Sequence, residues 1–265
     1  NHFLNSFLGG LFYRLFGDHQ VVMRLPSLLA FPLFFWSIVR FSKWLKSSAN
    51  QFALVITLTS SVFILEYFSL SRGYGLSFAF MMLAIERTAF LKRRTSWLVG
   101  ATAVIAWLLA ISANLALLPL ALFGMVHISS KLAKKNFFLT LIPILGSVAL
   151  SYAIVYARHL KDTGKLYLGD LTNIYDVTVH SLSKLAIGFE HLGIDIVITL
   201  VVLLVAFSLA YGFLRKRMET SHTLALYYLV ALVAVLLQAW ILNVNYPEDR
   251  SGIHLAILLI GAFVV

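Results

Sequence analysis

The chain has 265 residues, of which 60 % are hydrophobic and only 12 % carry a charge. Ordinary soluble domains are about half apolar and about a quarter charged, and disordered chains combine low hydrophobicity with high net charge, so both classes are excluded. The formal net charge of +10 would suit nucleic acid, but the basic residues stand in short clusters between apolar runs. This pattern is typical of a helical protein that crosses a membrane several times, and nucleic acid is not expected as a partner.

Residues 3–16 are predicted to form an amphipathic helix that lies in the membrane interface. Its apolar residues recur at helical spacing: Phe3, Leu4, Phe7, Leu8, Leu11, Phe12, Leu15 and Phe16. Polar and small residues occupy the other side, which suits a helix at a lipid surface. Gly17 is well placed to end it. The alternative interpretation is an ordinary buried helix.

Eight full membrane spans and a truncated ninth are predicted to follow, because apolar runs of about 20 residues are long enough to cross a bilayer. The expected spans are 21–41, 51–70, 74–91, 96–113, 115–130, 137–157, 193–214 and 222–243, with the truncated one from 252. The apolar stretch 97–128 is divided at 112–114, because both of its flanks are basic and a helical hairpin keeps them on one side. The expected fold is an all-α, polytopic transmembrane helix bundle, with six spans in 21–157 and the last ones in 193–265.

Basic residues gather on one side of this topology. The loops on that side, which include Arg40, Glu86 and Arg87, hold 13 basic and 2 acidic residues, whereas the rest of the chain holds 8 basic and 9 acidic ones. The positive-inside rule makes the first side cytoplasmic. The helix 3–16 then faces outward together with the loop 158–192, where a second amphipathic helix is expected. The whole chain, 1–265, is interpreted as a single integral membrane unit.

No motif of a soluble enzyme is present in the sequence, such as a Walker A loop, a dinucleotide-binding fingerprint or a zinc-protease helix. The eight histidines are scattered, and no pair has metal-ligand spacing on one helix face. Neither a metal nor another cofactor is therefore expected. The chain has no cysteine, which excludes disulfides and thiolate chemistry within it.

Ionisable residues near a membrane are costly and mark functional sites, and three outward clusters qualify. The first combines Asp18, His19 and Arg24, where the helix 3–16 meets the first span. Arg24 alternatively serves as an interfacial anchor whose charged end reaches the membrane surface. Another is the short turn 245–250, which ends in Asp249 and Arg250 and is alternatively a solvated turn.

The remaining cluster is the turn between the second and third predicted spans, with Glu66, Arg72 and Tyr74. Arg72 is the best candidate there for binding a phosphate, because its guanidinium group is always charged and matches phosphate with two parallel hydrogen bonds. Gly73 and Gly75 permit a tight turn or a close approach to a ligand. The alternative is a structural Glu66–Arg72 ion pair that closes the hairpin. Arginines beside carboxylates near the lipid surface suit a lipid phosphate or pyrophosphate that carries a polar head.

These segments resemble a known family. Residues 15–18 (LFGD) and 24–29 (RLPSLL) resemble the LFG…RLPS stretch of the GT-C class of membrane glycosyltransferases. His2 ahead of the helix 3–16 resembles the start of that stretch, and 71–74 (SRGY) is similar to the ARxY turn of the same proteins. Within that class, the segments most resemble the bacterial family related to protein O-mannosyltransferases and the lipid A aminoarabinose transferase. The likeness covers about 1–90 in motifs and the rest in topology.

The resemblance implies an inverting transferase in the bacterial inner membrane. Such enzymes take a sugar from a polyprenyl-phosphate donor and transfer it to a lipid, glycan or protein acceptor on the outer face. An aspartate in the first outward loop serves as the general base for the acceptor hydroxyl. That aspartate is expected before Asn1, so the chain is interpreted as a fragment of a longer protein.

The resemblance also suggests roles for individual residues. The expected donor-phosphate and lipid site comprises Arg72, Tyr74, Arg24 and Glu66, and the expected substrate-binding residues are His2, Asp249 and Arg250. Arg72, oriented by Glu66, would stabilise the phosphate as it leaves. Two alternative functions stay open. A transporter or flippase of lipid-linked glycans would show inverted repeats and polar sites in broken spans. A non-catalytic envelope assembly protein would use the loop 158–192 as its main functional element.

Overall fold

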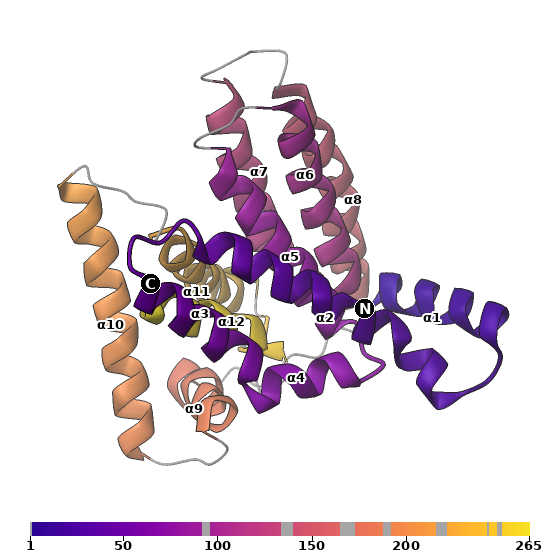
Figure 1. The fold of residues 1–265 in the computed structure, drawn as a ribbon, viewed down its shortest axis with the longest axis horizontal. Coiled ribbons are helices and arrows are strands. Elements are labelled where there is room, and N and C mark those ends of the chain that lie inside the picture. The colour runs from indigo at the N-terminus through magenta and orange to yellow at the C-terminus, as the bar shows by residue number, and fades with distance from the viewer. Residues whose placement is uncertain are drawn as a thin grey trace. The chain divides into compact units, whose positions relative to one another are not determined.

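The computed structural model describes residues 2–91, 96–133, 140–164, 173–187, 192–215, 222–242, 244–247 and 251–265. In these residues the chain is all-α, as predicted, and contains no strand (Figure 1). Their contacts group into two compact units, of which the first is 1–43 with 55–158 and the second is 44–54 with 159–265. The single integral unit proposed from the sequence stays a prediction.

The first unit holds the helices that carry the family resemblance. It comprises α1 (Phe3–Phe16), α2 (Gln20–Ser42), the second part of α3 (Ser48–Ser60), α4 (Val62–Ser69), α5 (Tyr74–Phe90), α6 (Trp97–Ala113), the 3₁₀ turn η1 (Leu115–Leu117), α7 (Leu118–Ala133) and most of α8 (Leu141–Asp162). The second unit comprises the first part of α3, the end of α8, the π-helical turn η3 (Tyr175–Val179), α9 (His180–Ile187), α10 (Leu192–Leu214), α11 (His222–Leu242) and α12 (Ile253–Val264).

Helix α1 has the predicted bounds and ends at the predicted glycine. Gly17 takes φ 86° and its N–H caps the helix by donating to the carbonyl of Tyr13. The side that packs against α2 is the polar and small one, where Asn5 and Gly9 are buried. The exposed side is an apolar ridge of Phe3, Phe7, Leu11 and Leu15. The helix is thus confirmed, and its position in a membrane interface stays a prediction.

Helices α2 and α5 run parallel and are tied at both ends. Near their starts, the Ser71 hydroxyl donates to the Met23 carbonyl at 2.8 Å. Near their ends, Arg40 Nε donates to Glu86 Oε1 at 3.1 Å. Aromatic rings of α2, α4 and α5 meet around Phe68 between these two points. The turn at Ser71, predicted to face outward, and the pair Arg40–Glu86, predicted to be cytoplasmic, therefore lie at opposite ends of one helix pair.

The predicted division at 112–114 is confirmed. Helix α6 ends at Ala113, and the Asn114 side chain accepts a hydrogen bond from the N–H of Ala116, which caps the following 3₁₀ turn. Helix α7 then runs antiparallel to α6. This is shown by two contacts, that of Gly100 with Leu132 at one end of the pair and that of Gly124 with Trp107 further along it. Figure 1 shows α6, α7 and α8 side by side, and Gly146 of α8 lies against side chains of both neighbours.

The second unit has a small core of its own. Val177, Ala239 and Tyr246 pack together there, with partly buried apolar residues around them. The hydroxyl of Thr178 donates to the carbonyl of Pro247 at 3.0 Å, which ties the π-helical turn to the segment 244–247. Helix α12 is buried along most of its length, whereas α10 exposes most of its apolar side chains.

The prediction of about eight full spans is not confirmed. Five helices in the described residues are long and apolar enough to cross a membrane, or six if the bent pair α3 and α4 is one span. Helices α5 and α6 have 17 residues each. At about 1.5 Å per residue they reach about 25 Å, which is less than the roughly 30 Å of a hydrocarbon core.

The predicted span 51–70 bends by 49° where α3 meets α4. Thr59 and Ser60 both donate their hydroxyl to the carbonyl four residues earlier, an interaction that bends helices. Ser61 then takes an extended conformation with ψ 119° and interrupts the helical hydrogen bonds. Hydropathy is continuous across this break, and for that reason the sequence analysis treats it as one span.

Gly124 is expected to be essential for the α6–α7 hairpin. A Cβ at this position would overlap the Trp107 indole, which is fully buried. Gly124→Ala should therefore lower the free energy of unfolding by about 1–3 kcal/mol, the usual cost of overpacking. Gly10→Ala is the matched control, because nothing lies within 4 Å of a Cβ there. Thermal denaturation in detergent measures both, and an unchanged midpoint for Gly124→Ala would contradict this packing.

Candidate functional site

The turn between α4 and α5 is fastened to α1 and α2. Asn5 of α1 donates its side-chain N–H to the carbonyl of Ser71 at 3.3 Å. The hydroxyl of the same serine donates to the carbonyl of Met23 in the first turns of α2. Arg24 directly follows Met23 in the sequence, and Arg72 directly follows Ser71. The structure therefore brings the backbone of both predicted phosphate-binding arginines to the same place.

His2 and Tyr74 pack against each other next to this turn. His2 Nδ1 lies 2.5 Å from the carbonyl oxygen of Ala113, and because a carbonyl only accepts, the ring nitrogen donates. The rings of His2 and Tyr74 meet edge to face with centroids 4.8 Å apart. Tyr67 meets the other side of Tyr74 in the same way at 5.3 Å. The Tyr74 side chain is thus fixed between α4 and the start of α1.

The two glycines of the turn allow other parts of the chain to come close. A Cβ on Gly73 would lie 2.5 Å from the Ala113 carbonyl oxygen and 2.9 Å from His2 Nδ1. A Cβ on Gly75 would lie 2.9 Å from the Phe68 ring. Gly73 has φ −30°, so its requirement is steric and does not concern a left-handed backbone. The close approach is to the end of α6 and to His2.

The charged side chains of the site are exposed. Arg24, Glu66 and Arg72 all reach the surface, and neither arginine has an ion-pair partner among the described residues. The alternative in which a Glu66–Arg72 ion pair closes the hairpin is therefore not seen. The hairpin is closed by Ser71, through its hydrogen bonds with α1 and α2. Both guanidinium groups stay available to an anion.

Two predicted substrate residues, Asp249 and Arg250, lie outside the described residues. The adjoining segment 244–247 belongs to the second unit, where Tyr246 is buried and Pro247 accepts the hydrogen bond from Thr178. The described site therefore consists of His2, Arg24, Arg72 and Tyr74, with Glu66 exposed on α4 beside them in sequence.

The structural roles of two residues of the site, Asn5 and Ser71, are not predicted from the sequence. Asn5 is assigned there to the polar side of an amphipathic helix, yet it is buried and holds Ser71. The sequence does contain one sign that Asn5 is buried, which is Gly9 four residues later on the same helix face. A small residue in line with a polar one is typical of a face that packs against another helix. Ser71 had no comparable signal.

A second polar cluster lies in the second unit, between α9 and α10. Asp195 is almost fully buried in the first turn of α10 and receives His180 Nδ1 at 2.8 Å on one carboxylate oxygen. The Ser183 hydroxyl donates to the other oxygen. These contacts satisfy a carboxylate that would otherwise be buried without a partner. Among the described residues no three His, Cys, Asp or Glu side chains gather as metal ligands would.

Comparisons of the chain with protein-family models, with curated proteins and with solved structures find no match. An assignment of function therefore depends on the motifs within 1–90 and on the way the structure brings them together. The arrangement of His2, the two arginines and Tyr74 is the structural observation that supports a functional assignment.

Gly73→Ala is expected to open this site. The new Cβ would displace His2 from the Ala113 carbonyl and loosen the start of α1, at a cost of about 1–3 kcal/mol. Trypsin should then cleave after Arg14, near the end of α1, several times faster than in the wild type. Ser69→Ala, an exposed change in the same turn, is the control. Equal cleavage rates for Gly73→Ala and the wild type would show that His2 does not hold α1 in place.

Proposed function

We propose that the chain is part of a membrane glycosyltransferase of the GT-C class, which moves a sugar from a polyprenyl-phosphate donor to an acceptor on the outer face of the bacterial inner membrane. One observation carries this proposal. Three segments that resemble the family, at 2, 15–29 and 71–74, are separated in sequence but meet through the contacts of His2, Met23 and Ser71. Motifs of one active site are expected to converge in this way.

Arg72 is proposed to bind the donor phosphate. Its side chain is exposed and has no ion-pair partner among the described residues, and its planar guanidinium group can donate two parallel hydrogen bonds to one phosphate. Arg24 adds a second positive charge from the start of α2. Tyr74 contributes its hydroxyl to the phosphate or sugar, and its ring, held by His2 and Tyr67, keeps the turn in position. Glu66 is proposed to orient Arg72 once the donor is bound.

The proposed reaction is a single displacement at the anomeric carbon. The acceptor oxygen forms the new bond while the bond to the donor phosphate breaks, and the electron pair leaves on the phosphate oxygen. Arg72 and Arg24 stabilise that developing charge, which is usually the largest catalytic contribution. The acceptor proton passes to a general base, the role that the family resemblance gives to an aspartate. Asp249 and Arg250 stay proposed substrate residues.

The proposed orientation places the starts of α2 and α5 on the outer side and their ends in the cytoplasm. The charge difference between the predicted loops supports it. The apolar ridge of α1 then lies in the outer interface, where exposed Phe and Leu side chains are favourable. Helices α5 and α6 are proposed to cross as short members of the bundle, because a bilayer thins locally around short spans.

The break between α3 and α4 favours the alternative of a carrier for lipid-linked glycans, because transporters bind substrates at interrupted helices. The break at Ser61 has no ionisable residue within four positions on either side. An anionic lipid would have no charged side chain to bind there. The transferase therefore remains the function that the geometry supports best.

Arg72→Ala is expected to reduce sugar transfer about 100-fold, the usual effect of removing a group that stabilises the leaving charge. Arg72→Lys should lose about tenfold, because an ammonium group lacks the planar fork. Release of polyprenyl phosphate from a polyprenyl-phosphate-linked sugar by the full-length protein in liposomes measures both. Arg14→Ala, an exposed arginine of α1, is the control. Wild-type release by Arg72→Ala would refute the assignment.

A further inference from the structure

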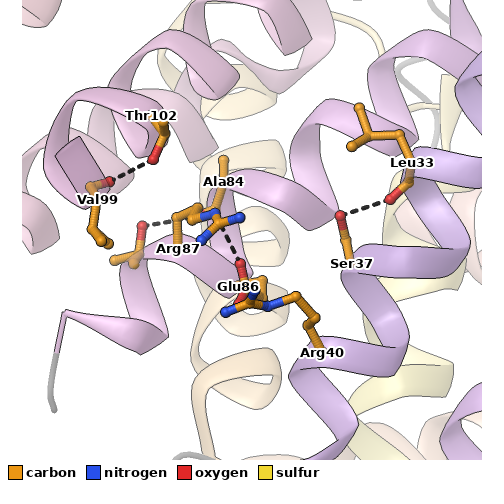
Figure 2. Close-up of polar contacts among 9 residues, drawn as sticks. Leu33, Ser37, Arg40, Ala84, Glu86, Arg87, Val99 and Thr102 are labelled. Carbon is orange, nitrogen blue, oxygen red and sulfur yellow. Dashed lines mark hydrogen bonds and ion pairs between the residues drawn. The ribbon is translucent and has the colours of Figure 1, made fainter. Parts of the chain in front are cut away.

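The opposite end of the α2–α5 pair holds a buried carboxylate between two arginines. Glu86 has no exposed side-chain area, and each of its oxygens meets one arginine (Figure 2). Arg40 Nε of α2 lies 3.1 Å from Oε1, and Arg87 Nε of α5 lies 3.2 Å from Oε2. A carboxylate buried without such partners would be strongly destabilising. Glu86 thereby pairs with both guanidinium groups, with a hydrogen bond from Arg40 and an ion pair by distance alone with Arg87.

An indole ring fixes the same two guanidinium groups from another direction. The guanidinium carbons of Arg40 and Arg87 each lie 5.0 Å from the centroid of Trp36. Arg40 also lies 5.7 Å from the ring centroid of Phe90. These distances are within the range of cation–π attraction. Two arginines thus share one aromatic ring and one carboxylate.

The terminal nitrogens of both arginines have no partner within the described part of the chain. Both contacts with Glu86 use Nε, and beyond the cation–π contacts neither arginine has a further interaction with these residues. The side chains are 34 % and 18 % exposed, so these donors are accessible from outside. Two arginines and one glutamate leave the cluster with one net positive charge. Lys43, exposed at the end of α2, adds another nearby.

We propose that Arg40 and Arg87 form a clamp for the phosphate of an anionic phospholipid in the leaflet that contains the ends of α2 and α5. Phosphate oxygens are the acceptors that paired guanidinium groups match best. Trp36, which both guanidinium groups contact, is itself 39 % exposed. Trp at the level of the head groups is typical of a membrane–water interface, where basic pockets between helices bind lipid head groups. This surrounding favours a lipid over a phosphate dissolved in water.

The clamp is separate from the proposed sugar-transfer site. It lies at the other end of the same helix pair, and its residues are not assigned a role in the transfer reaction. Its occupant is a membrane lipid that holds the ends of α2 and α5 in the bilayer. Lipid binding at the clamp can therefore be tested independently of the glycosyltransferase assignment.

The test is native mass spectrometry of the full chain in detergent with an equal mixture of phosphatidylglycerol and phosphatidylcholine. The wild type is expected to bind phosphatidylglycerol preferentially. Arg40→Gln combined with Glu86→Gln removes one charge of each sign, so the net charge is unchanged and no buried carboxylate is left unpaired. In this double variant the preference for phosphatidylglycerol over phosphatidylcholine should fall about tenfold, the effect of losing one charge-assisted hydrogen bond to phosphate. Lys43→Gln is the control, and it should keep most of the preference although its net charge falls.

Arg40→Lys provides a second variant if the double variant does not fold. Lysine keeps the ion pair with Glu86 but lacks the planar guanidinium group, so the preference for phosphatidylglycerol should fall about threefold. Unchanged preference in either folded variant would overturn the proposal. A loss in Lys43→Gln as large as in the double variant would also overturn it, because general surface charge would then explain the binding. Displacement of the lipid by an equal concentration of inorganic phosphate would identify a site for soluble phosphate instead.

Discussion

The structure of the first unit depends on the neutralisation of Glu86. A carboxylate with no exposed area, on a largely apolar helix, must have cationic partners, and Arg40 on α2 and Arg87 beside it in sequence supply them. This requirement fixes the end of α5 against the end of α2. The hydrogen bond between Ser71 and Met23 fixes their starts. With both ends fixed, the turn that carries Arg72 meets α1 and α6 in one arrangement, and the candidate site follows from it.

Close backbone approach is the second element of the architecture. Between helices in lipid there is little hydrophobic driving force, so association depends on small residues that let helices come near. Gly124 makes room for Trp107, and Gly73 makes room for His2 and the end of α6. Each glycine thus serves a specific contact. Gly73 is a point of close approach, as predicted from the sequence, and the groups that approach it are His2 and the Ala113 carbonyl of the same chain.

The sequence predicts the secondary structure of this chain well where charge and periodicity agree. The helix 3–16, its end at Gly17 and the break at 112–114 are confirmed, because the amphipathic period, the glycine and the basic flanks of 97–128 are all visible in the sequence. The bend at Ser61 was missed, because hydroxyl back-bonding leaves hydropathy unchanged. Of the candidate site, the turn at Arg72 was foreseen. The burial of Asn5 and Glu86 was not, because amphipathic reasoning assigns polar side chains to water, whereas here they hold helices together.

The two ends of the α2–α5 pair are proposed to bind two phosphate-bearing lipids, a sugar donor at the start and a phospholipid at the end. The most direct measurement is photo-crosslinking of the full-length protein with a photoreactive polyprenyl phosphate, followed by mass spectrometry of the labelled peptides. The account predicts labels within 66–75 and at the start of α2, which disappear with excess unlabelled polyprenyl phosphate. Labels confined to the region of Arg40, or labels that persist under competition, would contradict the central claim.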